Sequence, residues 1–180
     1  MLQITIPGFE YYDELNGKIV TVKGQDLQLE HSLVSISKWE SKWKKPFLGN
    51  DSKTRAETID YIRCMTLTQN VKPDVYQGIT YENIKKVNEY ISDPMTATTF
   101  RNNSRKGGSG SVITSEIIYY WMISLEIPME CQRWHLNRLL TLVRVCDEKS
   151  QPGKKMSKND VMSQYRSLNA ARRSRYGTRG

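Results

Sequence analysis

The side chains best suited to acid–base or metal chemistry are few in this chain. Its 180 residues include two histidines, His31 and His135, and three cysteines, Cys64, Cys131 and Cys146. Cys131 and His135 are four residues apart, so on a helix their ligand atoms would share one face, as a metal site requires. No other pair among these residues has a ligand-like spacing. We therefore interpret Cys131 and His135 as a core thiol beside a core histidine and expect neither a metal nor another cofactor.

A glycine-rich run at 107–110 is the second candidate for chemistry. In a P-loop, Lys-Ser or Lys-Thr directly follows the last glycine, whereas Ser111 and Val112 follow it here. The surrounding stretch, 101–111, contains no apolar side chain, so we expect a mobile surface loop there. The sequence signatures of hydrolases, kinases and zinc enzymes are also missing. Together with the scarcity of histidine, this pattern indicates that the chain is not an enzyme.

Between residues 39 and 48, aromatic side chains are interleaved with lysines. Trp39, Trp43, Phe47 and Leu48 are the candidate partner-binding residues, because exposed aromatic side chains anchor protein interfaces and can also stack on bases. The competing interpretation is structural. Trp39 and Trp43 are four residues apart, which is the spacing of a buried helical stripe whose lysines face water. The spacing favours the buried stripe, and both alternatives stay open at this point.

The net charge of +8 is concentrated at the C-terminal end of the chain. Residues 151–180 contain eight basic residues and one acidic residue, so the preceding residues are close to neutral. The arginines of this basic tail are Arg166, Arg172, Arg173, Arg175 and Arg179. Such a tail can bind phosphates or acidic partners, and it is also typical of a solvated chain end. The charge therefore predicts a property of the tail and not of the folded body.

Hydrophobic periodicity predicts the elements that position these residues. Alternating apolar residues indicate short strands at 2–6, 18–23 and 26–30. Helical spacing begins after residue 32, and the predicted helix N-caps are Thr54, Thr80 and Thr114. The strongest apolar stripe runs from Leu136 through Leu139 to Cys146.

The fold class that follows is mainly α, within the α+β class. We predict a helical bundle with a small N-terminal antiparallel β meander and a basic C-terminal helical tail. The corresponding segments are the β meander at 1–31, the helical core at 32–150 and the basic tail at 151–180. Two or three short strands are marginal alone, so the meander is expected to pack against the helices.

The sequence also bears on the environment of the protein. No stretch stays apolar for the roughly 20 residues needed to cross a bilayer. The first residues lack the basic start and apolar stretch of a signal peptide. The widely spaced cysteines indicate reduced thiols rather than a disulfide framework. We expect a cytosolic protein with no membrane association, and the sequence allows either a monomer or an oligomer.

Several blocks of the sequence resemble a group of small proteins from long-tailed bacteriophages. The blocks are ISKWESKWKKPFL at 36–48, YIRCMT at 61–66, MTATTF at 95–100, ITSEIIYYWM at 113–122 and WHLNRLL at 134–140. The resemblance extends over residues 36–180 and includes the basic ending GTRG. Proteins of this group resemble tail assembly chaperones, which associate with the tape measure protein and with tail tube subunits while a tail is built.

The resemblance implies a viral protein of virion morphogenesis that acts in the host cytoplasm by protein–protein binding. Its implied partners are the phage tape measure protein and the tail tube protein. One alternative is a virion structural protein of the neck, tail or capsid, which would be located in the virion. A second alternative is a nucleic-acid-binding accessory protein, which would make a weak contact through the basic tail.

Overall fold

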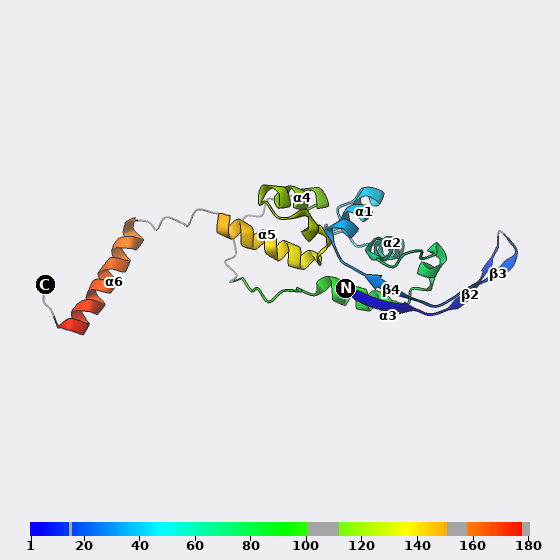
Figure 1. Ribbon diagram of the computed structural model, residues 1–180, viewed down its shortest axis with the longest axis horizontal. Helices are drawn as coiled ribbons and strands as arrows, with labels where there is room; N and C mark the ends of the chain where they lie inside the picture. The colour runs from blue at the N-terminus through cyan, green and yellow to red at the C-terminus, as the bar shows by residue number, and fades with distance from the viewer. Residues whose placement is uncertain (15, 101–111, 151–157, 178–180) are drawn as a thin grey trace. The chain divides into compact units, whose positions relative to one another are not determined.

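The computed structural model describes residues 1–14, 16–100, 112–150 and 158–177 of the chain (Figure 1). Internal contacts divide the chain into two compact units, Met1–Val145 and Cys146–Gly180. The loop expected at 101–111 and the side chain of Arg179 lie outside the described residues. The three-segment division predicted from the sequence stays a prediction.

The strands of the first unit pair as one long antiparallel hairpin. β1 (Leu2–Ile6) pairs with β4 (Gln25–Leu29), and β2 (Phe9–Asp13) pairs with β3 (Lys18–Val22). The chain reverses between β2 and β3, where Gly17 has a φ of 60°, a left-handed value that favours glycine. The predicted N-terminal antiparallel β structure is confirmed. Its strands pair as the two arms of one hairpin, β1 with β4 and β2 with β3, whereas in a meander each strand pairs with the next one in the chain. The sequence pattern did not predict β2.

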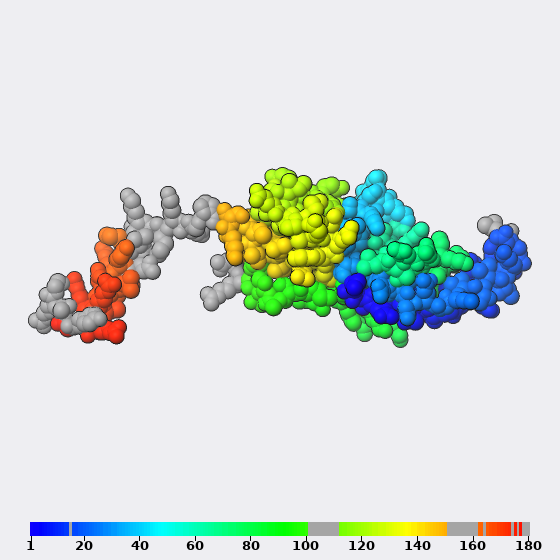
Figure 2. All heavy atoms as spheres, viewed as in Figure 1, coloured from blue at the N-terminus to red at the C-terminus, as the bar shows by residue number. Residues whose placement is uncertain are grey.

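Two facing glycines separate the two halves of this hairpin. A Cβ atom added to Gly24 would lie 3.0 Å from the backbone nitrogen of Gly8 and 3.0 Å from the carbonyl oxygen of Ile6. Only glycine allows backbones to approach so closely. Beyond the two glycines, β2 and β3 continue as a two-stranded arm, drawn in blue in Figure 2. The ring of Phe9 anchors the base of this arm against Gly78.

Most of the remaining described residues are helical, which confirms the predicted mainly α character. The α-helices are α1 (Leu33–Trp43), α2 (Arg55–Met65), α3 (Tyr81–Ser92), α4 (Ser115–Ser124), α5 (Leu136–Ser150) and α6 (Lys158–Tyr176). The 3₁₀ helix η1 (Pro73–Gly78) lies between α2 and α3 in the chain, and η2 (Met129–Arg133) lies between α4 and α5.

Side-chain caps fix where several of these helices begin. Oγ1 of Thr54 accepts the N–H of Glu57 at 3.2 Å, and the carboxylate of Glu57 accepts the N–H of Thr54 at 2.8 Å, which is the predicted capping box. Oγ1 of Thr80 accepts the N–H of Asn83 at 3.2 Å, as predicted. Thr114 occupies the N-cap position of α4, but its side chain makes no capping hydrogen bond. A residue from another helix caps α4 instead.

The hydrophobic core of the first unit surrounds α1. This helix packs against α2, α4 and η2, while α3 and η1 pack against β1. The side chains that are completely buried include Ile6, Leu27, Leu29, Leu33, Ile36, Ile62, Met65, Ile118 and Met122. Leu139 of α5 is completely buried as well, as its place on the predicted apolar stripe requires.

The cap of α4 is supplied by Glu40, a carboxylate buried in this core. Glu40 lies in the last turn of α1 and is 7% exposed. Its Oε2 accepts the backbone N–H of Ser115, the first residue of α4, at 2.8 Å. Its Oε1 accepts the backbone N–H of Phe47 at 2.7 Å. Because a negative charge is favourable at a helix N-terminus, one side chain joins α1 both to the loop that follows it and to α4.

We expect Glu40→Gln to lower the free energy of unfolding by about 2 kcal/mol, because an amide leaves one buried N–H facing another donor. Urea unfolding at neutral pH measures this change. Glu89→Gln, which removes an exposed carboxylate from α3, is the matched control and should change stability by less than about 0.5 kcal/mol. Equal stability of Glu40→Gln and the unchanged chain would contradict the role assigned to Glu40.

Candidate functional site

The four predicted partner-binding residues are divided between the core and the surface. Trp39 is 1% exposed and Phe47 is 7% exposed, and their rings meet edge to face with centroids 5.3 Å apart. Leu48 is exposed and Trp43 is half-buried. Trp39 is therefore buried as the structural interpretation expects, whereas Trp43, the other member of the predicted stripe, is only half-buried. Phe47, which that interpretation did not include, is buried as well. Within this set, a partner can reach only Trp43 and Leu48 without unfolding the segment.

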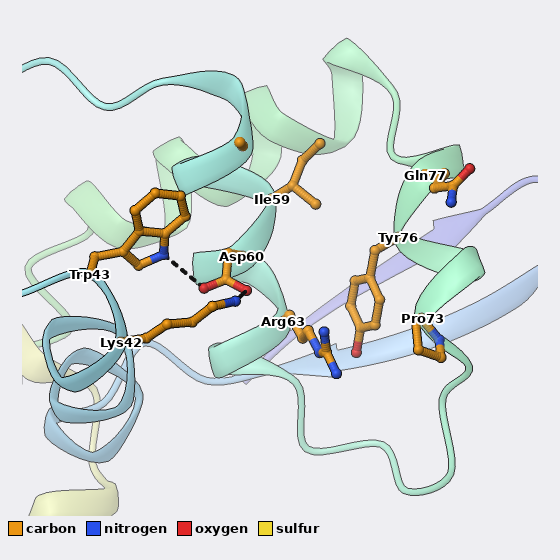
Figure 3. Close-up of a pocket in the computed structure, with 9 residues that line it drawn as sticks. Lys42, Trp43, Ile59, Asp60, Arg63, Pro73, Tyr76 and Gln77 are labelled. Carbon is orange, nitrogen blue, oxygen red and sulfur yellow. Dashed lines mark hydrogen bonds and ion pairs between the residues drawn. The ribbon is translucent and has the colours of Figure 1, made fainter.

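Trp43 forms one wall of a pocket of about 350 Å³ between α1, α2 and η1 (Figure 3). Tyr76 of η1 lies on the opposite side, and Ile59 and Arg63 of α2 lie between the two aromatic rings. The lining is mostly apolar, and the pocket opens to solvent. Leu48 is not among its lining residues. This Trp43 pocket is the candidate functional site.

The ring of Trp43 is held in one orientation. It stacks on the buried ring of Trp39 with centroids 6.1 Å apart. Its Nε1 donates a hydrogen bond to Oδ2 of Asp60 at 2.8 Å, and Oδ1 of Asp60 accepts from Nζ of Lys42. A ring that is already fixed loses little conformational entropy when a partner binds, so this wall of the pocket is preorganised.

A second set of contacts fixes the loop after α1 against α2. Nζ of Lys45 lies 2.8 Å from Oε1 of Glu57, and Nε1 of Trp39 donates to the backbone oxygen of Glu57 at 2.9 Å. The hydrogen bond from Lys45, followed by that from the backbone of Thr54, lowers the pKa of Glu57 to about 2. Glu57 is therefore ionised at neutral pH. Because α1 and α2 supply two sides of the Trp43 pocket, its geometry depends on this connection.

Both histidines are buried and take part in hydrogen bonds. Nδ1 of His31 lies 2.5 Å from the hydroxyl oxygen of Tyr61. Nδ1 of His135 accepts the backbone N–H of Asn137 at 3.3 Å, so its Nε2 carries the proton and donates to the carbonyl oxygen of Tyr90 at 3.0 Å. The two imidazole rings lie edge to face with centroids 5.1 Å apart. Both ring nitrogens of His135 are therefore used within the fold.

The metal hypothesis for Cys131 and His135 has no geometric support in the described part of the chain. Cys131 is buried in η2, and the ring nitrogens of His135 already have partners. Within the described ranges, no group of three or more His, Cys, Asp or Glu side chains is arranged to hold a metal ion. Both side chains are buried in the first unit.

α4 carries an exposed apolar surface that was not predicted from the sequence. Tyr120 is 67% exposed and Ile123 is 68% exposed, whereas Ile118 and Met122 on the same helix are completely buried. The signal is visible in the sequence, because residues 117–123 of this helix are all apolar or aromatic, whichever side they face. Such a helix is normally covered on all sides. The outer face of α4 is therefore a second candidate contact surface.

The second unit contains the predicted basic residues on α6. Its exposed arginines are Arg166, Arg172, Arg173 and Arg175. Met162, Tyr165 and Leu168 are exposed on the same helix and follow one another at intervals of three residues. Residues at this spacing lie along one side of a helix, so α6 presents apolar side chains as well as arginines.

Comparisons of the chain with protein-family models, with curated proteins and with solved structures gave no match. Within the described ranges, no helix combines the length and the apolar character needed to span a membrane. The features of the chain that bear on its function are therefore the sequence blocks, the Trp43 pocket and the exposed surfaces.

Burial, with a smaller contribution from His135, lowers the pKa of His31 from 6.5 to about 3. Below pH 6.5 the unfolded chain binds a proton at His31 that the folded chain does not, so stability is lost as the pH falls from 6.5 towards 3. We expect this residue to reduce the free energy of unfolding by roughly 2 kcal/mol between pH 7 and pH 5.

Urea unfolding of His31→Gln at both pH values checks this expectation. Glutamine can still form a hydrogen bond with the hydroxyl of Tyr61 but does not titrate, so the loss of stability between pH 7 and pH 5 should be smaller by roughly 2 kcal/mol. The same pH dependence in both proteins would contradict the assignment to His31.

Proposed function

We propose that this chain is a bacteriophage tail assembly chaperone that binds the tape measure protein and the tail tube protein and catalyses no reaction. The observation that carries the proposal is the Trp43 pocket, an open and mostly apolar site with a fixed aromatic wall. Large rigid rings such as those of tryptophan and tyrosine are common anchors of protein interfaces. The resemblance supplies the identity of the partners, and the pocket supplies a means of contact.

The size of the pocket favours a short partner segment. Its volume of about 350 Å³ is near the lower end of the roughly 300–1,000 Å³ found for ligand pockets. It therefore suits one or two side chains of a bound chain rather than an extended surface. Binding through so small a site is weak and reversible, which is the behaviour required of a factor that is used during assembly and then leaves.

The state of the titratable groups supports binding over catalysis. His31 and His135 have their hydrogen bonds inside the core, away from the pocket lining. At the pocket itself, the carboxylate of Asp60 is paired with Lys42 and Trp43. General acid–base catalysis needs a titratable group that can exchange a proton with a substrate. The groups around the Trp43 pocket are arranged to hold its walls in place.

Two other functions lead to different experimental results. A virion structural protein would remain in purified particles, whereas a chaperone would be missing from them, so mass spectrometry of particles separates the two. A nucleic-acid-binding accessory protein is favoured by one observation, the exposed arginines of α6. Its DNA binding would weaken steeply with salt.

Trp43→Ala should weaken the capture of a tape measure fragment about thirtyfold or more, because truncating an interface hot spot costs about 2 kcal/mol or more. A pull-down titration measures capture, and the melting temperature of each variant is recorded beside it. Trp134→Ala is the matched control, since Trp134 is also half-buried but does not line the pocket. Full capture by Trp43→Ala would contradict the proposal. So would a result in which Trp43→Ala and Trp134→Ala lose the same amount of capture and the same amount of melting temperature.

Deletion of residues 153–180 should preserve capture of the tape measure fragment and reduce its dependence on salt. The arginines of the tail add an attraction for acidic groups that is screened within about 8 Å at physiological ionic strength. Capture at low and high salt, measured with and without the tail, checks this. Loss of capture at every salt concentration would place the principal contact in the tail instead.

A further inference from the structure

We infer that the Trp43 pocket takes a partner segment in which an apolar side chain is followed closely by an aspartate or glutamate. In this arrangement the apolar side chain lies between Trp43 and Tyr76, and the carboxylate binds the guanidinium of Arg63. The inference rests on the proposed function, because it names the chemistry of the protein segment that the pocket would recognise.

The first step concerns the charges that line the pocket. Lys42 and Asp60 form an ion pair, so together they leave no net charge. Arg63 also lines the pocket, its side chain is exposed, and its guanidinium has no ion pair or hydrogen bond among the described residues. The pocket therefore carries one uncompensated positive charge next to apolar walls.

The second step concerns the position of that charge. Arg63 lies on α2 between the two aromatic walls, with Asp60 one turn before it on the same helix (Figure 3). A segment that fills the space between Trp43 and Tyr76 thus brings its neighbouring residues close to the guanidinium. Arginine presents a planar set of donors that matches a carboxylate, and such pairs are frequently bidentate.

The third step is a comparison of possible partner segments. A purely apolar segment would cover Arg63 and remove water from its charge without replacing the lost hydrogen bonds, which is unfavourable. A basic segment would be repelled by Arg63. A segment that combines an apolar side chain with a carboxylate satisfies both features of the pocket, so charge complementarity selects it.

A direct test uses two peptides that differ in one functional group, acetyl-Leu-Phe-Asp-amide and acetyl-Leu-Phe-Asn-amide. Each is titrated into the full chain, and the indole N–H resonance of Trp43, assigned with Trp43→Phe, reports on the pocket. We expect the aspartate peptide to bind about fivefold more tightly than the asparagine peptide, a modest gain because the ion pair is partly solvated. Equal affinities of the two peptides would overturn the inference. An unchanged chemical shift of the Trp43 indole N–H with both peptides would overturn it as well.

Variants of Arg63 show whether it is the group that binds the carboxylate. Arg63→Gln should lower the affinity for the aspartate peptide to that for the asparagine peptide, while Arg63→Lys should keep part of the preference because the charge remains. Arg55→Gln, which removes an exposed arginine at the other end of α2, is the matched control and should bind both peptides normally. An unchanged preference in Arg63→Gln would overturn the inference.

Capture of a tape measure fragment separates this inference from the proposed function. If the full chain captures the fragment, and Trp43→Ala loses capture but Arg63→Gln does not, the proposed function stands and the carboxylate inference fails. If the aspartate peptide binds in an Arg63-dependent way but the fragment is not captured at all, the inference stands and the proposed function fails. A loss of capture of about fivefold in Arg63→Gln supports both.

Discussion

The buried carboxylate of Glu40 is the interaction on which the arrangement of the first unit depends. It has no ion-pair partner within the described residues, so its charge is compensated by hydrogen bonds to backbone N–H groups. These donors belong to Phe47 and Ser115, which lie in different segments of the chain. Displacing either segment would leave a buried charge with too few donors, which is strongly unfavourable. The loop after α1 and the start of α4 are therefore held in one position relative to α1.

The same constraint supports one wall of the Trp43 pocket. The hydrogen bond to Glu40 holds Phe47 in the core, where its ring packs against Trp39. Trp39 in turn supports the stacked ring of Trp43. The wall that a partner would contact thus rests on two buried rings and a buried carboxylate. A site built in this way keeps its geometry in the absence of a ligand, so little conformational entropy is lost when a ligand binds.

The parts of the fold that could be predicted from the sequence are those set by local interactions. The capping box of Thr54 and Glu57 involves residues three apart, and its hydrogen bonds form as predicted. The cap of α4 could not be found in this way, because the carboxylate of Glu40 and the amide of Ser115 are 75 residues apart in the chain. Local pattern pointed to Thr114, whose side chain does not cap the helix.

The candidate site was predictable only in part, for a similar reason. Helical spacing places Trp39 and Trp43 on one face, but it does not say that one ring is buried and the other lines a pocket. That difference arises from contacts with α2 and η1, and above all from Tyr76, which the sequence analysis did not single out. The exposed outer face of α4 was not predicted, because an apolar sequence indicates burial, whereas Tyr120 and Ile123 are exposed.

Hydrogen exchange of the full chain, with and without a bound tape measure fragment, tests the role of the Trp43 pocket most directly. Binding there covers the end of α1 and the adjoining sides of α2 and η1, so amides in 40–45, 59–63 and 74–78 should exchange more slowly in the complex. Slower exchange confined to α4 or α6, with unchanged exchange around Trp43, would locate the partner elsewhere and contradict the pocket as the binding site.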